Sequence, residues 1–325
     1  MSSSGPNCCH VLSYDYLDFD VFLNIYVFYR LAGYRILRNI DPLRSGLVVL
    51  LRGIPPRIYP DFTGVVHVYD YVKEYLVDYA SYFPSASTIY LVSVSISPEI
   101  ASSGSYTYIP GYLPIIPQIW TTNNYQKKSI LSPLHISNYK PMGFDFFQQQ
   151  LIQLARLGMV KIYGAKWDKV DIQASSLTYF SANRLLAKAS HCYGLMYPYQ
   201  RGSSLSGRMW QGPLHGCCVL SEPRTNIFDC PGVFEVDDYL QAARRLPTYG
   251  PLLARHARDY WMNKTLCLAA ELNMSLSFNR LGREVWCARF IMYRQHLLSQ
   301  WDLYIRHPST SLFAAFRARV RRLLR

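Results

Sequence analysis

Short runs of apolar residues, separated by longer segments with helical spacing, recur along the first hundred residues of the chain. Continuous runs of Val, Leu and Ile are typical of strands buried on both faces of a parallel sheet. Such strands are predicted at 11–13, 47–51, 65–69 and 89–94. Between them, 19–33 predicts a helix, with a buried strand as the alternative, and 71–82 predicts a helix that Phe83 and Pro84 end. The alternation of strand and helix predicts a first parallel α/β domain.

Residues 97–126 interrupt this rhythm, because they hold four prolines and many Ser, Thr and Asn. We interpret them as loops that end in an interdomain linker near Asn123–Lys128. A second series follows, with strands predicted at 134–137, 160–164, 191–196, 217–221 and 233–236 and helices at 144–157, 179–190 and 205–215. Gly158 closes the first of these helices, Asp237 and Asp238 start a further one, and the chain looks helical from about residue 250 onward.

Two such series in tandem predict two Rossmann-like domains that face each other across a cleft. The expected boundaries are 1–126 for a first domain, 127–249 for a second domain and 250–325 for a helical C-terminal extension.

Charge is divided unequally between these parts. The chain has a net charge of +13, yet residues 1–140 hold ten Lys/Arg against nine Asp/Glu, whereas residues 141–325 hold twenty-four against twelve. We therefore expect the second half to meet anions such as nucleotide phosphates or acidic lipids. Nucleic acid is not an expected partner, because zinc-finger spacing, a basic helix with heptads and an aromatic RNA-binding strand are all missing.

The most informative stretch is 191–222, in which a strand leads into a loop rich in Gly and Ser and then into a helix. Such a loop exposes backbone N–H groups at the positive end of a helix, where a diphosphate can bind, and arginines can fork onto phosphate oxygens. The alternative is an ordinary strand-to-helix turn with solvated arginines. The predicted diphosphate-binding residues are Arg201, Gly202, Ser203, Ser206, Gly207 and Arg208.

Over about residues 130–245 the chain resembles the C-terminal domain of GT-B glycosyltransferases, of the group-1-like set related to spore-maturation CgeB proteins. The shared pattern is Gly-x-Arg-x-x-(Glu)-x-x-x-x-Gly-x-x-x-(Leu)-x-(Glu/Asp), and residues 160–168 resemble a further strand-and-loop segment of these proteins. The resemblance implies that Gly207 and Arg208 meet the donor diphosphate and that Gly216 packs the end of the helix against the next strand. Gln211 stands where the family usually has a Glu that binds the ribose hydroxyls. An amide still donates and accepts hydrogen bonds but carries no charge.

Further candidates lie at the predicted ends of strands. Lys140 follows the first strand of the second domain and is a candidate phosphate contact, with a solvated lysine as the alternative. His67 and Asp70 end a strand of the first domain and are candidate general bases for an acceptor hydroxyl. The alternative is an ordinary strand histidine and a helix-capping aspartate. We predict no metal site, since the one DxD pattern, Asp18–Asp20, lies outside the donor half.

The C-terminal segment 312–325 carries five arginines in its last nine residues and apolar side chains at helical spacing. It predicts either a basic amphipathic helix on an anionic membrane or a terminal helix that crosses back and packs on the first domain. The chain shows no secretory signal and no apolar stretch of spanning length, so we expect a cytoplasmic protein, with membrane association through 312–325 as an option.

Together these features predict a glycosyltransferase that moves a sugar from a nucleotide-diphosphate donor to an acceptor hydroxyl. The nucleotide sugar is then a substrate, and neither cofactor nor metal is expected. The alternative is a catalytically silent scaffold of the same fold that binds a nucleotide or a protein partner.

Overall fold

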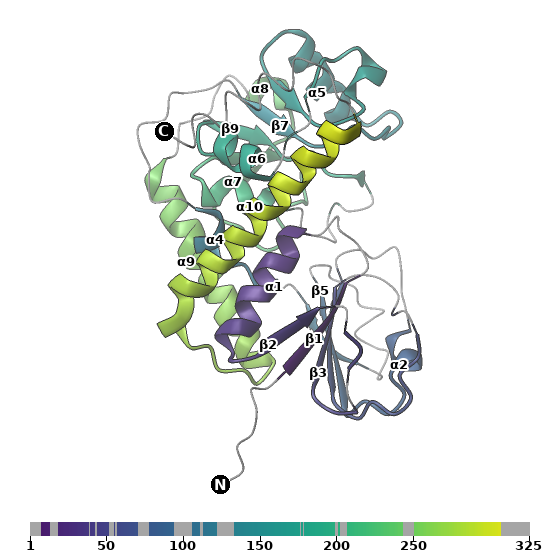
Figure 1. Cartoon of the computed structure of the whole chain (residues 1–325). Coiled ribbons are helices and arrows are strands. Elements are labelled where there is room, and N and C mark those ends of the chain that lie inside the picture. Colours follow the sequence, from purple (N-terminus) through teal and green to yellow (C-terminus); the bar gives the residue numbers. More distant parts are fainter. Residues whose placement is uncertain are drawn as a thin grey trace.

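The structure is a computed structural model. It describes residues 8–13, 19–38, 40–42, 44–51, 55, 57–70, 78–93, 106–110, 113–121, 133–175, 177, 179–198, 201, 207–242 and 250–306. Two parallel sheets follow each other along the chain, with helices against them and two long helices at the end (Figure 1). The predicted α/β class with two Rossmann-like sheets is confirmed.

The first sheet has six parallel strands in the order β2-β1-β3-β4-β5-β6. Its strands are β1 (Cys8–Ser13), β2 (Arg35–Arg38), β3 (Leu47–Leu51), β4 (Val65–Asp70), β5 (Thr88–Ser93) and β6 (Thr107–Pro110). The segment with two predicted alternatives forms a helix, α1 (Phe19–Leu31), which contacts β2. The helix predicted over 71–82 is not continuous: Asp78 is the non-helical N-cap of a single turn, α2 (Tyr79–Tyr82), and residues 71–77 lie outside the described part of the chain.

Residues 97–126 contain more structure than the predicted loops. The edge strand β6 pairs with β5, and the single turn α4 (Pro117–Trp120) is buried against the C-terminal helices. The prolines that suggested a loop are compatible with both elements, because Pro110 lies at the end of an edge strand and Pro117 opens a helix. The predicted linker Asn123–Lys128 lies outside the described residues.

The second sheet has five parallel strands in the order β11-β10-β9-β7-β8. Its strands are β7 (Leu134–Ile136), β8 (Lys161–Tyr163), β9 (His191–Tyr193), β10 (Cys218–Ser221) and β11 (Val233–Glu235). The helical elements of this region are α5 (Phe146–Arg156), η2 (Trp167–Val170), α6 (Tyr179–Leu186), α7 (Arg208–Leu214) and α8 (Tyr239–Ala242). All five strands were predicted from the apolar runs. Gly158 follows α5 with a φ of 70°, as expected for a residue that ends a helix.

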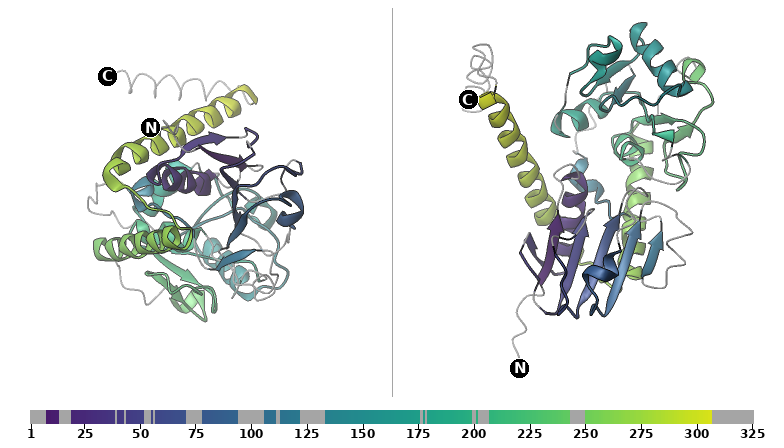
Figure 2. Two further views of the ribbon diagram at one scale, coloured as in Figure 1. Left: turned by 90° about the horizontal axis from the view of Figure 1, so that it is seen from below. Right: turned by 90° about the vertical axis from the view of Figure 1, so that its right-hand side faces the viewer.

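The C-terminal helices connect the two sheet regions. After α9 (Pro251–Glu271) and the turn η4 (Phe278–Arg280), the long helix α10 (Leu281–Arg306) contacts α1 of the first region and α6 of the second (Figure 1). Figure 2 shows α10 running beside α1, along the side of the first sheet. The helical extension is thus confirmed for 250–306. A terminal helix that packs back on the first domain was one of the two alternatives for 312–325. In the structure α10 makes such a contact with α1, and 312–325 lies outside the described residues.

Specific contacts fix α10 in this position. Arg30 of α1 donates from Nε and Nη2 to the two carboxylate oxygens of Glu284, at 3.0 and 3.2 Å. Glu284 is almost fully buried, so this paired geometry is needed to keep its charge inside the protein. Arg289 donates to backbone carbonyls at the end of α4, which stabilises the negative end of that helix. One hydrophobic cluster extends from α1 through α4 to α7, α9 and α10, so the two regions share a core.

None of the described helices is both long enough and apolar enough to cross a membrane.

Candidate functional site

The strand order of the second sheet defines where a ligand is expected. The order reverses between β7 and β9, which pair through Leu134 and Cys192. At such a switch point the connections after the two strands leave in opposite directions and open a crevice at the carboxyl ends. The residues at this point are 137–140 after β7 and 194–197 after β9. Lys140 therefore lies where it was predicted, at the carboxyl end of the first strand of this sheet.

Arg208 joins the two sides of the switch point. Its guanidinium donates to the carbonyl oxygen of Leu195, after β9, and to the hydroxyl oxygen of Ser137, after β7, the latter at 3.4 Å. Burial lowers the pKa of Arg208, while the carboxylate of Glu222 raises it. An arginine stays charged under such shifts, and two acceptors do not exhaust its five N–H donors. Arg208 thus holds a positive charge at the point where the topology predicts a ligand.

Helix α7 explains how Arg208 is held there. Met209 and Trp210 are buried in the core, whereas Arg208 and Gln211 are half-buried and lie three residues apart on one side of the helix. Gly207 precedes α7, and its carbonyl accepts from the backbone N–H of Gln211 at 3.0 Å. The predicted roles of Gly207, Arg208 and Gln211 in donor binding stay predictions. The same holds for Gly202, Ser203 and Ser206, which lie outside the described residues.

Glycines allow the close packing of α7. A Cβ on Gly212 would lie 2.7 Å from Val219 of β10, and a Cβ on Gly194 would lie 2.7 Å from the same side chain. Gly216 follows the helix with a φ of 69°, in the left-handed region, and leads directly into β10. Gly216 therefore lies at the turn from helix end to strand that the resemblance implied.

Arg201 is engaged by protein carboxylates. Its Nη1 lies 2.8 Å from Oδ2 of Asp145, and its Nη2 lies 3.1 Å from Oε1 of Glu222 and donates to the carbonyl of Met196 at 3.1 Å. Burial alone would lower the pKa of Arg201, but the bonds to Asp145 and Glu222 raise it overall. Arg201 as a diphosphate ligand stays a prediction. The observed contacts hold Arg201 against α5, β10 and the segment after β9, so they fix the position of the chain within the predicted loop.

Glu222 and Asp145 were not singled out from the sequence, although Glu222 occupies the acidic last position of the resemblance pattern. Glu222 is fully buried after β10, and its Oε1 also accepts from the backbone N–H of Met196 at 2.9 Å. Burial raises the pKa of Glu222, and Arg201 and Arg208 act in the opposite direction. Asp145 caps α5 through Oδ1, which accepts from the N–H of Gln148 at 2.9 Å, while its Oδ2 holds Arg201.

Lys140 is an exposed cation after β7. Its Nζ lies 4.8 Å from the ring centre of Tyr197, so the side chain spans from the β7 side of the switch point to the β9 side. The backbone carbonyl of Lys140 accepts from the side-chain amide of Gln148 at 2.9 Å, which holds the loop in place. Its role as a phosphate contact stays a prediction.

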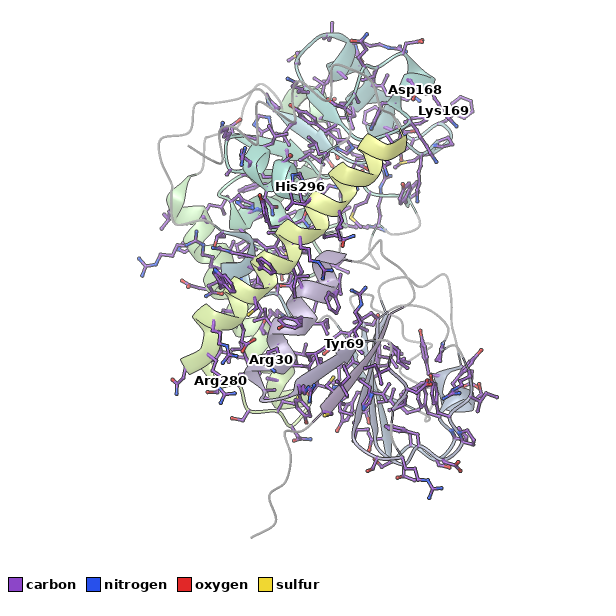
Figure 3. All side chains as sticks on the ribbon, in the orientation of Figure 1. Arg30, Tyr69, Asp168, Lys169, Arg280 and His296 are labelled. Carbon is purple, nitrogen blue, oxygen red and sulfur yellow. The ribbon has the colours of Figure 1, made fainter. Side chains whose placement is uncertain are left out.

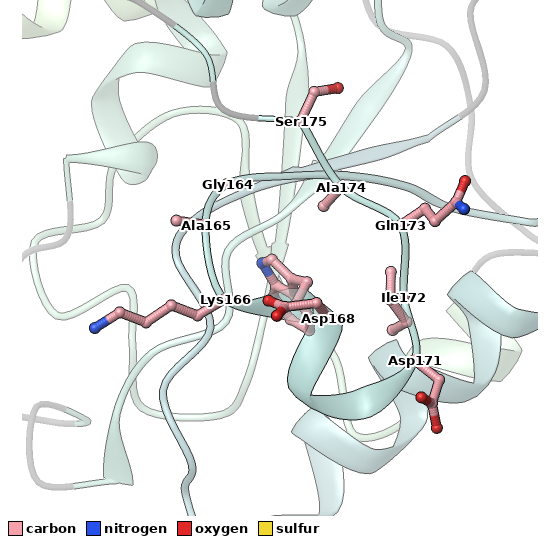
Figure 4. A pocket seen from close by; sticks show the side chains of 10 residues that line it. Gly164, Ala165, Lys166, Asp168, Asp171, Ile172, Gln173, Ala174 and Ser175 are labelled. Carbon is pink, nitrogen blue, oxygen red and sulfur yellow. The ribbon is translucent and has the colours of Figure 1, made fainter. Parts of the chain in front are cut away.

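A cavity of about 860 Å³ lies beside the switch point, lined by residues 164–175 after β8 (Figure 4). Asn138 accepts from the N–H of Ala165 at 2.8 Å, and the indole of Trp167 donates to the carbonyl of Ser137 at 2.6 Å. Gly164 is required here, because a Cβ on it would lie 2.0 Å from the oxygen of Ser137. Of the residues that line this cavity, only 164–168 were singled out from the sequence, as part of the segment 160–168 that resembles the family.

The candidates in the first domain lie in a different setting. His67 is 3% exposed, its Nδ1 lies 2.7 Å from the hydroxyl of Tyr29, and burial lowers its pKa to about 3. The hydroxyl of Tyr29 also lies 2.9 Å from that of Tyr69. This environment matches the alternative of a core histidine, and a general-base role for His67 stays a prediction. Asp70 is the last residue of β4, at the carboxyl edge of the sheet, and its side chain lies outside the described part.

Within the described residues, no group of three or more His, Cys, Asp or Glu side chains is arranged to hold a metal ion.

The chain matches no protein-family model, and no curated protein matches it. Its fold is similar to that of a DNA-modifying β-glucosyltransferase, solved with and without its substrate uridine diphosphoglucose. The TM-score is 0.54 at 8% identity, over 82% of this chain and 99% of that chain. Weaker likenesses are to AviGT4, a glycosyltransferase of avilamycin A biosynthesis (TM-score 0.47, 11% identity, 85% and 98% covered), and to Anabaena HepE in complex with UDP (TM-score 0.41, 10% identity, 89% and 99% covered).

Identities this low concern the fold and leave the predicted relation to CgeB proteins a prediction. With its two parallel sheets in tandem and its crossing C-terminal helix, the chain has the two-domain GT-B fold.

Proposed function

We propose that this protein is a glycosyltransferase that moves a sugar from a nucleoside-diphosphate donor to an acceptor hydroxyl. The observation that carries the proposal is Arg208, whose charge lies across the switch point of the second sheet. Lys140 follows β7 at the same end of this sheet, and the cavity at 164–175 follows the neighbouring strand β8. The fold supports the same reading, since the β-glucosyltransferase it resembles has uridine diphosphoglucose as its substrate.

In the proposed reaction, the acceptor oxygen forms a bond to the anomeric carbon while the bond from that carbon to the diphosphate breaks. Negative charge then develops on the leaving diphosphate, and fixed cations next to it lower the barrier. Arg208 supplies such a charge in a fixed position, and Lys140 supplies a second one at the surface. No metal is needed in this scheme.

The acceptor must lose a proton during transfer. We assign this step to the carboxylate of Asp70, since its residue ends β4 at the carboxyl edge of the first sheet. His67 is less suited as a general base, because burial lowers its pKa to about 3, so the imidazole binds a proton only weakly, and its Nδ1 already contacts the hydroxyl of Tyr29. The acceptor is proposed to be the hydroxyl of a glycan, a lipid-linked glycan or a small molecule. A cytoplasmic enzyme that reaches acidic membranes through 312–325 would have access to all three.

A catalytically silent scaffold of the same fold is the second candidate. Two observations favour it: Gln211 stands at the position where the resembling family has Glu, and Arg201 contacts protein carboxylates. A scaffold would bind the nucleotide sugar but would not consume it.

A donor screen tests the proposal. The melting temperature of the full chain is measured with UDP-, GDP-, ADP- and CMP-sugars, and ligand at a hundred times its dissociation constant stabilises by about 2.7 kcal/mol. We expect one nucleotide class to raise the melting temperature, and release of its nucleoside diphosphate with an acceptor to follow. Stabilisation without turnover supports the scaffold. If none of the four classes stabilises the protein, the proposed donor site is wrong.

A further inference from the structure

Helix α10 has an apolar face that packs inside the protein. Val285, Ala288 and Met292 are buried in the shared core, and Glu284 of the same side is paired with Arg30. These contacts account for the attachment of α10 to the rest of the molecule, so its other side would ordinarily be polar.

The opposite side of α10 is also apolar. Trp286, Phe290, Tyr293 and Leu297 are spaced by four, three and four residues, which places them in one line along the helix. We call these four residues the outer stripe. Trp286 is 66% exposed, Phe290 56% and Leu297 46%, and the rings of Trp286 and Phe290 stack with centroids 5.8 Å apart. Large apolar side chains gathered in this way mark an interaction surface.

The charged side chains described around the outer stripe are all positive. Arg283 and Arg294 are exposed and lie three and four residues from members of the stripe, and the exposed Arg280 precedes the helix (Figure 3). Among the described side chains of α10, Glu284 is the one acid, and it is buried on the other side. The outer stripe is thus apolar and is flanked by arginines, with no described carboxylate beside it. It complements a surface in which an apolar layer lies beneath negatively charged groups.

We propose that the outer stripe of α10 lies on an anionic lipid bilayer, with the helix in the plane of the interface. Trp and Tyr are favoured at the headgroup level, and arginines attract anionic headgroups. Pairing with a second copy is less well matched, because facing outer stripes would bring Arg283 and Arg294 of both copies together without a carboxylate between them. This proposal is independent of glycosyl transfer, and its residues differ from those of 312–325.

The test is co-sedimentation of the full chain with vesicles of phosphatidylcholine and with vesicles of equal parts phosphatidylcholine and phosphatidylglycerol. Trp286→Gln with Phe290→Gln removes the two most exposed members of the outer stripe and keeps helix-compatible side chains. The matched control is Leu157→Gln with Met159→Gln, which removes two exposed apolar side chains of the second region. A chain truncated before Leu312 separates the stripe from the basic tail, and the melting temperature without ligand shows whether each variant is folded.

We expect the parent to bind the anionic vesicles and not the neutral ones, with binding that falls as salt rises. The Trp286→Gln/Phe290→Gln variant should bind the anionic vesicles about tenfold more weakly or worse. The control variant should bind them like the parent, and both variants should melt like folded proteins. The truncated chain should keep salt-dependent binding through the stripe. The proposal is overturned if the double variant binds like the parent, if truncation alone abolishes binding, or if the parent is a dimer that the double variant dissociates and that ignores vesicles.

Discussion

The two sheets share the same strand order but differ in what lies at their carboxyl ends. Read as β2-β1-β3-β4-β5 and as β8-β7-β9-β10-β11, both sheets have their switch point between the second and third strands, and the first sheet adds β6 at its far edge. In the second sheet this point carries Arg208, Lys140 and a buried set of ion pairs. In the first sheet the residues that follow β1 and β3 lie outside the described part of the chain, and the described polar groups of β4, on His67 and Tyr69, bond to Tyr29 in the core.

The second sheet shows what turns a switch point into a candidate binding site. Topology provides a crevice, and the chemistry depends on which charges the neighbouring segments bring to it. In the second region Glu222 and Asp145 hold Arg201, so that the backbone before the predicted loop is fixed before any ligand arrives. Under the proposed function, the second region holds a preformed site for the anionic part of the donor, and the first region binds the acceptor.

The largest expected effect concerns Glu222. Glu222→Ala leaves Arg201 without one of its two carboxylates in a buried setting, which should cost about 3–5 kcal/mol of unfolding free energy. Glu222→Gln should cost less, since an amide oxygen can still accept. Urea unfolding measures both. The control is Asp41→Asn, which breaks the exposed Arg57–Asp41 pair of the first region and should cost about 1 kcal/mol or less. Equal costs for Glu222→Ala and Asp41→Asn would contradict the account.

A second prediction concerns acid. Burial lowers the pKa of His67 and of His135 to about 3, so each binds a proton more readily in the unfolded chain. Their contribution to stability is therefore present above pH 6.5 and is lost as the pH falls from there toward 3, by up to about 1.4 kcal/mol per pH unit and histidine. His67→Gln and His135→Gln should each flatten the loss of unfolding free energy in this range. An unchanged pH dependence in both variants would show that neither histidine is held neutral.

Arg208→Ala sharpens the comparison between the two sides. It removes a charge-assisted contact to the donor and should weaken donor binding by about 1.5–3 kcal/mol, measured by isothermal titration. His67→Gln in the first region should leave donor affinity unchanged. Arg184→Ala, at an exposed position of α6, controls for the loss of a positive charge. A parent-like affinity of Arg208→Ala would remove the central residue of the proposed site.

The smallest effect is expected for Gln211→Glu. The two side chains have nearly the same shape, and the residue shares the half-buried side of α7 with Arg208. A carboxylate that accepts from ribose hydroxyls should hold or improve donor affinity, by about 1 kcal/mol at most. Loss of donor binding in this variant would show that the protein contacts its donor differently from the family it resembles.

Strands buried on both faces were predictable from the sequence, because a continuous apolar run such as Leu47–Leu51 has few other interpretations. Strands at or near a sheet edge were harder. Thr107–Pro110 was assigned to loops and Arg35–Arg38 was not predicted, since both are short and have exposed residues at both ends, so neither forms a continuous apolar run.

The candidate site shows a similar division. Arg208 and Lys140 could be placed, because a loop before a helix and a position after a strand are local features. The partners of Arg201 could not, because Asp145 and Glu222 belong to other segments and meet it only through the packing of α5 and β10. The burial of His67 also depends on α1, which brings Tyr29 against β4.

The most direct test of a donor site in the second region is hydrogen–deuterium exchange of the full chain with and without a saturating nucleotide sugar from the donor screen. The account predicts slower exchange at 137–140, 164–175, 194–198 and 207–211, which lie around the switch point and the cavity after β8, and little change at 65–70. A donor site in the second region would be contradicted if a saturating nucleotide sugar slowed exchange only in the first sheet, or if it did not slow exchange around β7 and β9.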